Sequence, residues 1–253
     1  MSMKKLMAAN WKMYKTQDEA KNTIKDLINI LGKKLSVERD VLICPPYTSL
    51  RVVAEEIKDI DYMYLGGQNF YPAKEGAYTG EISPRMLLDV GCSYALVGHS
   101  ERRHIFCEKD DLLKEKVKYG FEVGLNIIFC IGEKIEQRRA GQVDQVLKSQ
   151  LSVLKDIKNM SGIENRLVIA YEPVWAIGTG EVAGEKEIFE AHKIVRDELK
   201  NIYGAVGNSI RILYGGSVKP DNASNIIDID NVDGVLVGGA SLNADSFSKI
   251  VTA

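Results

Sequence analysis

Glu172 lies between a short apolar run and an apolar segment that is rich in glycine. The run Leu167–Ala170 is typical of a buried strand, and Pro173, which has no backbone N–H to donate, ends it. The segment 174–180 follows, and a strongly periodic helix is predicted from about Glu185. A carboxylate in this position is a candidate general base that the segment behind it covers during a reaction. A salt-bridged glutamate at an ordinary turn would produce the same local pattern.

Polar side chains of catalytic types also follow other short apolar runs. His99 and Glu101 come directly after Tyr94–Val97, and Asn10 and Lys12 stand at the end of the first such run. Surface charges placed at random would not prefer one end of the strands, so this clustering favours an enzyme. The full set of these residues is Asn10, Lys12, Gln68, His99, Glu101, Glu172 and Ser217.

The elements that would position these residues alternate along the chain as strand and helix. Continuous apolar runs are expected where both faces of a parallel strand are buried. Eight strands alternating with eight helices in 253 residues predict a single (β/α)8 barrel, the TIM barrel, over residues 1–253 as one domain. An open, doubly wound parallel sheet is the alternative. The predicted strands are 6–11, 41–44, 62–65, 94–97, 126–130, 167–170, 211–214 and 234–237.

Two helices have recognisable boundaries. Thr16 and Glu19 have the spacing of a capping box, and Gly32 is predicted to end the helix that follows. Gly120 is interpreted as the stop of a helix that begins at Asp110.

Two glycine pairs follow the seventh and eighth predicted strands, in Tyr214-Gly-Gly-Ser217 and Val237-Gly-Gly-Ala240. Without bulky side chains, the backbone N–H groups there can approach an oxygen-rich anion, and a helix start adds partial positive charge. Phosphate binding after these two strands is frequent in (β/α)8 barrels. The pairs therefore predict a phosphate site.

Composition excludes several classes of protein. A net charge of −2 and a pI near 6.0 give no basis for binding nucleic acid or an acidic membrane. No apolar run approaches the ~18 residues of a transmembrane helix, and the N-terminus lacks the apolar stretch of a signal peptide. The four cysteines show no C-x-x-C spacing, which argues against a disulfide framework or a zinc site. We expect a soluble, reduced, cytoplasmic protein.

No cofactor and no metal are predicted. Gly178, Gly180 and Gly184 are spaced one residue too widely for the dinucleotide fingerprint and lack its tight strand–turn–helix context. No grouping of Asp, Glu and His has metal-ligand spacing.

Five motifs, in order along the whole chain, resemble those of the triosephosphate isomerases. The motifs that contain His99 and Glu172 are highly specific to that family. The resemblance implies a cofactor-independent isomerase that interconverts dihydroxyacetone phosphate and D-glyceraldehyde 3-phosphate through an enediolate, in glycolysis and gluconeogenesis. The motifs are Asn10-Trp-Lys-Met13, Gly98-His-Ser-Glu-Arg-Arg103, Ala170-Tyr-Glu-Pro-Val-Trp-Ala-Ile-Gly-Thr-Gly180, Tyr214-Gly-Gly-Ser217 and Val237-Gly-Gly-Ala240.

By this resemblance, each candidate residue has an implied role. Glu172 is the base that moves a proton between C1 and C2, and His99 is the neutral imidazole that polarises the carbonyl. Lys12 holds the substrate and opposes oxyanion charge, Asn10 helps to hold the oxygens, and Glu101 pairs with Lys12. The implied phosphate-binding residues are Gly178, Ser217, Gly238 and Gly239.

The resemblance also implies a lid and a second subunit. Residues 173–183 resemble the family's mobile lid, which excludes water from an intermediate that readily loses its phosphate. The long segment 69–84, which carries Thr79, resembles the arm that inserts into a second copy and reaches its Asn10 and Lys12. A homodimer is therefore expected. At the end of the lid this chain departs from many relatives, with Gly184–Glu185 in place of Ser/Thr-Pro, and we expect a looser hinge there.

Other residues are expected to have structural roles. His192 lies in an apolar helical stripe and is predicted to be a packing residue, and His104 is predicted to lie on the surface. Cys130 is expected to pack in the core, Gln68 to hold the interface segment, and Trp175 to belong to the lid hinge.

Two other functions are compatible with such a barrel. A Schiff-base phosphosugar lyase of the aldolase type would use Lys12 as its nucleophile. A catalytically silent phosphosugar-binding protein would have no need for the base Glu172.

Overall fold

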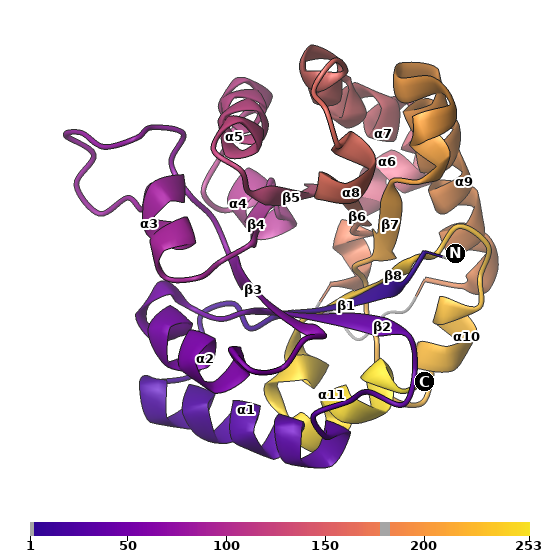
Figure 1. The fold of residues 1–253 in the computed structure, drawn as a ribbon. Coiled ribbons are helices and arrows are strands. Elements are labelled where there is room, and N and C mark those ends of the chain that lie inside the picture. Colours follow the sequence, from indigo (N-terminus) through magenta and orange to yellow (C-terminus); the bar gives the residue numbers. More distant parts are fainter. Residues whose placement is uncertain (1–2, 178–182) are drawn as a thin grey trace.

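Eight parallel strands form a closed barrel in sequence order, with β1 paired to both β2 and β8 (Figure 1). The computed structural model describes residues 3–177 and 183–253. Because the sheet closes on itself, the predicted (β/α)8 barrel is confirmed and the open sheet is excluded. The strands are β1 (Lys5–Asn10), β2 (Arg39–Cys44), β3 (Met63–Gly67), β4 (Tyr94–Val97), β5 (Asn126–Ile131), β6 (Leu167–Tyr171), β7 (Arg211–Tyr214) and β8 (Gly234–Val237).

Helices surround the barrel, and the described residues form eleven of them where eight were predicted. Five of the helices, α3, α4, α6, α8 and α10, have between four and six residues, and so short a helix shows little helical period in the sequence. The helices are α1 (Gln17–Leu31), α2 (Leu50–Ile57), α3 (Pro84–Asp89), α4 (Ser100–His104), α5 (Asp110–Glu122), α6 (Ile135–Arg139), α7 (Val143–Leu151), α8 (Ile163–Arg166), α9 (Glu185–Tyr203), α10 (Ala223–Ile227) and α11 (Ala244–Val251). Short 3-10 turns cover Tyr47–Ser49, Ser152–Ile157, Val174–Ala176, Gly204–Asn208 and Gly239–Leu242.

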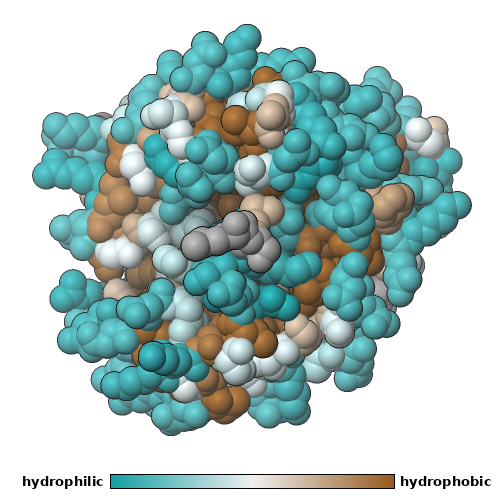
Figure 2. All heavy atoms as spheres, turned by 45° about the vertical axis from the view of Figure 1, so that its right-hand side comes forward, coloured by the Kyte–Doolittle hydropathy of each residue, from teal (hydrophilic) through white to brown (hydrophobic). Residues whose placement is uncertain are grey.

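The central residues of the strands are apolar because they are buried on both faces. On β1, Leu6 and Ala8 belong to the cluster that fills the barrel, whereas Met7 and Ala9 belong to the larger cluster between barrel and helices. The outer surface is mainly polar: in Figure 2 hydrophilic side chains cover most of the visible face and hydrophobic ones show between them. No helix in the described part of the chain is long and apolar enough to cross a membrane.

The first helix begins and ends as predicted. Glu19 Oε2 accepts the backbone N–H of Thr16 at 2.7 Å, which is half of the predicted capping box. Gly32 follows the last turn with a φ of 78°, a conformation that favours glycine.

The prediction that Gly120 ends a helix is wrong. Helix α5 continues through Gly120 to Glu122. A Cβ at Gly120 would lie 2.6 Å from Ile127 Cδ1 and 3.0 Å from Phe70 Cζ. The glycine therefore allows α5 to pack closely on β5, and Gly124, with a φ of 101°, follows the end of the helix.

The segment between β3 and α3 contains no helix or strand and projects from the body of the molecule (Figure 1). Contacts within the segment order it: the rings of Tyr71 and Tyr78 lie 4.3 Å apart, and Ile82 O accepts the N–H of Tyr71. All of its residues from Lys74 to Glu81, Thr79 among them, are exposed.

His192 is a buried packing residue, as predicted. It is 0% exposed in α9, its Nδ1 lies 2.8 Å from Asn231 O, and the ring of Tyr171 meets it edge-on. Burial lowers the pKa of His192 to about 4, because a charged imidazolium would be poorly solvated there.

This burial makes the stability of the protein depend on pH. Between the unfolded pKa of about 6.5 and the folded pKa of about 4, the unfolded chain binds a proton that the folded chain does not bind. The contribution of His192 is therefore complete above pH 6.5, and about 3 kcal/mol is lost as the pH falls to 4. Urea unfolding of His192→Asn, which keeps a donor but does not titrate, is expected to show a pH dependence weaker by about this amount. His104→Asn, at an exposed position, is the control and is expected to change the profile less; parallel profiles for the wild type and His192→Asn would contradict the assignment.

Candidate active site

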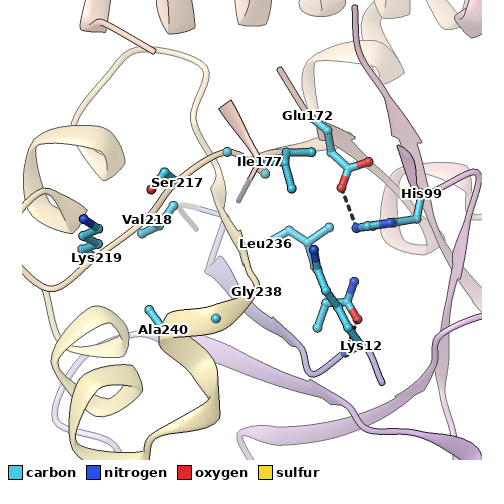
Figure 3. Close-up of a pocket in the computed structure, with 14 residues that line it drawn as sticks. Lys12, His99, Glu172, Ile177, Ser217, Val218, Lys219, Leu236, Gly238 and Ala240 are labelled. Carbon is cyan, nitrogen blue, oxygen red and sulfur yellow. Dashed lines mark hydrogen bonds and ion pairs between the residues drawn. The ribbon is translucent and has the colours of Figure 1, made fainter. Parts of the chain in front are cut away.

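A cavity of about 380 Å³ opens at the carboxyl ends of the strands (Figure 3). The cavity brings Asn10, Lys12, His99 and Glu172 together with the loops that follow β7 and β8. Gly178 lies outside the described residues, as do the other lid residues in 178–182. The lining consists of Asn10, Lys12, His99, Glu172, Ile177, Gly215, Gly216, Ser217, Val218, Lys219, Leu236, Gly238, Gly239 and Ala240.

Glu172 follows β6 directly and is 2% exposed. Its Oε1 lies 2.9 Å from His99 Nε2, and its Oε2 accepts the backbone N–H of Ser100 at 2.9 Å. In Figure 3 the two side chains point toward one another at one end of the cavity. A buried carboxylate with these two partners is held at the cavity wall and stays close to any molecule bound inside.

His99 stands where β4 passes into α4, and the helix start determines its protonation pattern. The backbone N–H of Glu101 donates to His99 Nδ1 at 3.3 Å, so Nδ1 acts as an acceptor and the ring proton lies on Nε2. Burial lowers the pKa of His99, but the carboxylates of Glu172 and Glu101 outweigh it and leave the pKa above its usual value. Nε2 therefore presents a proton toward Glu172 and the cavity.

Lys12 has a backbone conformation that is unusual for a lysine, with a φ of 53°. Two side chains hold this backbone: Asn10 Oδ1 accepts the N–H of Lys12 at 3.0 Å, and Gln68 Nε2 donates to its carbonyl at 2.8 Å. The side chain then meets Glu101, with 2.7 Å between Nζ and Oε1. A strained residue that its surroundings hold in place is typical of a functional position.

Ser217 and Gly238 line the cavity away from the Glu172–His99 pair (Figure 3), and Gly239 is a further lining residue without a side chain. The predicted acid–base residues and three of the four predicted phosphate-binding residues therefore face one cavity. Glu101 lines a neighbouring cavity with Gln68 and reaches this one through Lys12.

Two features of the site have no signal of their own in the sequence. Ser100 contributes its backbone N–H to Glu172, and any residue type could do so. Gly215 makes room for the carboxylate, because a Cβ there would lie 2.9 Å from Glu172 Cγ. The glycine pair 215–216 was predicted to serve an anion, and Gly215 in addition leaves space for the candidate base.

Residues predicted to have structural roles lie around the site. Cys130 is 0% exposed, and burial raises the pKa of its thiol well above the usual value, as expected of a packing residue. His104 is exposed, as predicted. The side-chain Nε2 of Gln68 donates hydrogen bonds to the backbone carbonyls of Lys12 and Cys44. Among the described residues, no group of three or more His, Cys, Asp and Glu side chains could hold a metal ion.

A closed parallel barrel with ionisable side chains gathered at its carboxyl end defines a (β/α)8-barrel enzyme. The sequence profile of the family described as triosephosphate isomerase matches residues 5–253. Proteins named triosephosphate isomerase from Nitratidesulfovibrio vulgaris (strain DP4) and Oleidesulfovibrio alaskensis are 54% and 52% identical to this chain, over 99% of it and 100% of each relative. One from Dictyoglomus thermophilum is 45% identical over 98% of both chains. The chain belongs to the triosephosphate isomerase family, whose members are cofactor-independent isomerases.

The room that Gly215 gives to Glu172 can be tested by substitution. In Gly215→Ala the new Cβ would displace the carboxylate, so kcat for the isomerase reaction is expected to fall about ten-fold or more, while the melting temperature changes little. Gly239→Ala is the matched control, because a Cβ there meets no atom within 4 Å, and its main effect is expected on KM. Equal kcat values for wild type and Gly215→Ala would show that the carboxylate does not need this space.

Proposed function

We propose that this protein interconverts dihydroxyacetone phosphate and D-glyceraldehyde 3-phosphate through an enediolate. One observation carries the proposal: a buried carboxylate, Glu172, lies 2.9 Å from the Nε2 of His99 at the wall of a cavity that also holds Lys12. Membership of the triosephosphate isomerase family supports the choice of substrate.

Glu172 is the proposed base. To reach the substrate, its carboxylate leaves the Ser100 N–H and His99 Nε2 and moves next to a C–H bond of the bound ketose. It removes the proton from C1 and returns it to C2, while the hydroxyl proton of O1 passes to O2 by way of His99 Nε2. The two transfers together convert ketose to aldose, and the reverse reaction uses the same steps. A positioned general base contributes about 10²- to 10⁴-fold to the rate.

His99 is the proposed electrophile. Its Nε2 proton polarises the carbonyl oxygen, and the N–H of Glu101 keeps Nδ1 unprotonated. When Glu172 moves toward carbon, its contribution to the raised pKa of His99 falls, whereas burial continues to lower that pKa. A neutral imidazole is the proposed form in the reaction, because Nδ1 accepts the Glu101 N–H.

The remaining residues are proposed to bind the substrate and to stabilise its negative charges. Lys12 lies in the cavity with its ammonium balanced by Glu101 at 2.7 Å, and it opposes the negative charge of the enediolate while Asn10 holds the substrate oxygens. The phosphate binds at the end of the cavity that Ser217, Gly238 and Gly239 line, with Gly178 as a further proposed contact. Residues 173–183 exclude water from the intermediate.

The proposed setting is the cytoplasm, where the reaction serves glycolysis and gluconeogenesis. No cofactor takes part in the proposed steps.

A homodimer is also proposed. The segment 69–84 projects from the barrel and exposes Thr79 (Figure 1). A second cavity beside Lys12 has mainly polar lining residues and also includes exposed apolar side chains, of which Met13 is 93% and Phe106 63% exposed. A second copy that inserts the tip of this segment there would bury these side chains and reach Asn10 and Lys12.

The role of Glu172 is tested by a coupled assay with glyceraldehyde 3-phosphate. Glu172→Gln keeps the size of the side chain but cannot take a proton from carbon, so kcat is expected to fall about 10²- to 10⁴-fold with KM changed much less. Equal activity of wild type and variant would refute the mechanism. Reduction with borohydride in the presence of substrate separates the lyase alternative, because only that reaction would leave a covalent adduct on Lys12.

The dimer is tested by light scattering after gel filtration. The wild type is expected to have twice the chain mass of 28.1 kDa, and Thr79→Arg is expected to approach the mass of one chain, because the arginine would not fit the partner's cavity. Val206→Arg, at another exposed apolar position, is expected to leave the mass unchanged. A monomeric wild type, or equal masses for wild type and Thr79→Arg, would contradict the proposed interface.

A further inference from the structure

Arg138, in α6, contacts residues on both sides of the segment 178–182. Its side chain is 17% exposed and does not line the catalytic cavity. One side consists of 171–177, which carries Glu172; the other consists of 183–187, where α9 begins. We call these the base flank and the helix flank.

Arg138 meets the base flank through a buried glutamate. Its Nε donates to Glu133 Oε1 at 2.8 Å, and the same oxygen accepts the Tyr171 hydroxyl at 3.1 Å and the Trp175 indole N–H at 2.9 Å. Arg138 Nη2 also donates to the Tyr171 hydroxyl at 3.1 Å, and the guanidinium lies over the Trp175 ring at 5.3 Å. Because Glu133 is 0% exposed, its charge needs these partners. Arg138 is therefore fixed to Tyr171 and Trp175, one on each side of Glu172 and Pro173 in the chain.

The base flank is also held through its backbone. Val174 donates its N–H to Glu133 O at 3.1 Å, and Glu172 donates its own to Ile131 O at 2.7 Å. The backbone on either side of Pro173 thus follows the position of the Glu133 and Arg138 pair.

Arg138 meets the helix flank through Glu187. Its Nη1 lies 3.7 Å from Glu187 Oε1, while Glu187 Oε2 accepts the N–H of Gly184 at 2.8 Å. One carboxylate thus bonds the residue that precedes α9 and faces the charge that holds the base flank. The hydrogen bond from Gly184 to Glu187 lies at the Gly184–Glu185 step, where the sequence predicted a looser hinge.

We propose that Arg138 is a positioning residue that couples the two flanks, so that the backbone carrying Glu172 and the start of α9 keep one relative position. Arg138 acts through Glu133 and Glu187 and touches no reacting atom. The coupling needs a guanidinium, because a lysine ammonium has no planar fork with which to reach the tyrosine, the indole ring and two carboxylates at once. The consequence for catalysis rests on the proposed function, whereas the coupling does not.

Glu187→Gln is the sharpest variant for testing the coupling. A glutamine oxygen can still accept the N–H of Gly184, so the cap persists while the charge that faces Arg138 is lost. Arg138→Lys keeps the charge but loses the fork. Asp197→Asn is the matched control, because it removes an ion pair with Lys193 from the same helix at a distance from both flanks.

Amide hydrogen exchange of the protein without substrate measures the coupling directly. In Glu187→Gln, exchange at Val174 and Ala176 on the opposite flank is expected to rise about two- to five-fold, the range of a partly exposed ion pair. Arg138→Lys is expected to raise exchange on both flanks, and Asp197→Asn on neither. Increases confined to 183–187 in Glu187→Gln would overturn the proposal, since a helix cap alone would produce them.

Kinetics of the same variants test the consequence for Glu172. Arg138→Lys is expected to lower kcat about ten-fold with KM within about two-fold, and Glu187→Gln to lower kcat about two- to five-fold. In the double variant Arg138→Lys/Glu187→Gln the second change is expected to add little, because the contact is already lost. Fully additive effects on kcat would overturn the positioning role. A wild type without isomerase activity would refute the proposed function, and the exchange measurement would still decide the coupling.

Discussion

The burial of every strand on both faces is the constraint on which the site depends. Ionisable side chains cannot be placed along such strands without a large loss of solvation, so they stand where the strands end. Closure of the sheet between β1 and β8 then brings those ends into one ring. Glu172 after β6, His99 after β4 and Lys12 after β1 consequently share a cavity, although 160 residues separate the first and last of them.

Much of the fold could be predicted because each strand is a continuous apolar run. The bounds of β4, β7 and β8 coincide with the predicted ones, and each of these strands is followed by glycine. Gly120 was misinterpreted because its role is contact with Ile127 and Phe70, which sequence spacing does not reveal. Helices α3, α4, α6 and α8 escaped prediction because so short a helix shows no clear period, and their positions depend on the barrel beneath them.

The types of residue in the site were predictable, and the geometry that makes them work was not. The resemblance named His99 and Glu172, and the structure places them 2.9 Å apart. The contacts of the Ser100 and Glu101 N–H groups and the space that Gly215 leaves depend on how the folded backbone places these residues. Such contacts use backbone atoms or empty space, for which residue identity carries little information.

The left-handed backbone of Lys12 has a consequence for protein engineering. A lysine with a φ of 53° costs about 1 kcal/mol or more of folding free energy, and glycine would avoid most of that cost. A search that ranked substitutions by stability alone would therefore favour replacing Lys12, the residue that places an ammonium in the cavity. Thermostabilisation of this protein should hold position 12 constant, together with Asn10 and Gln68, which keep its backbone in place.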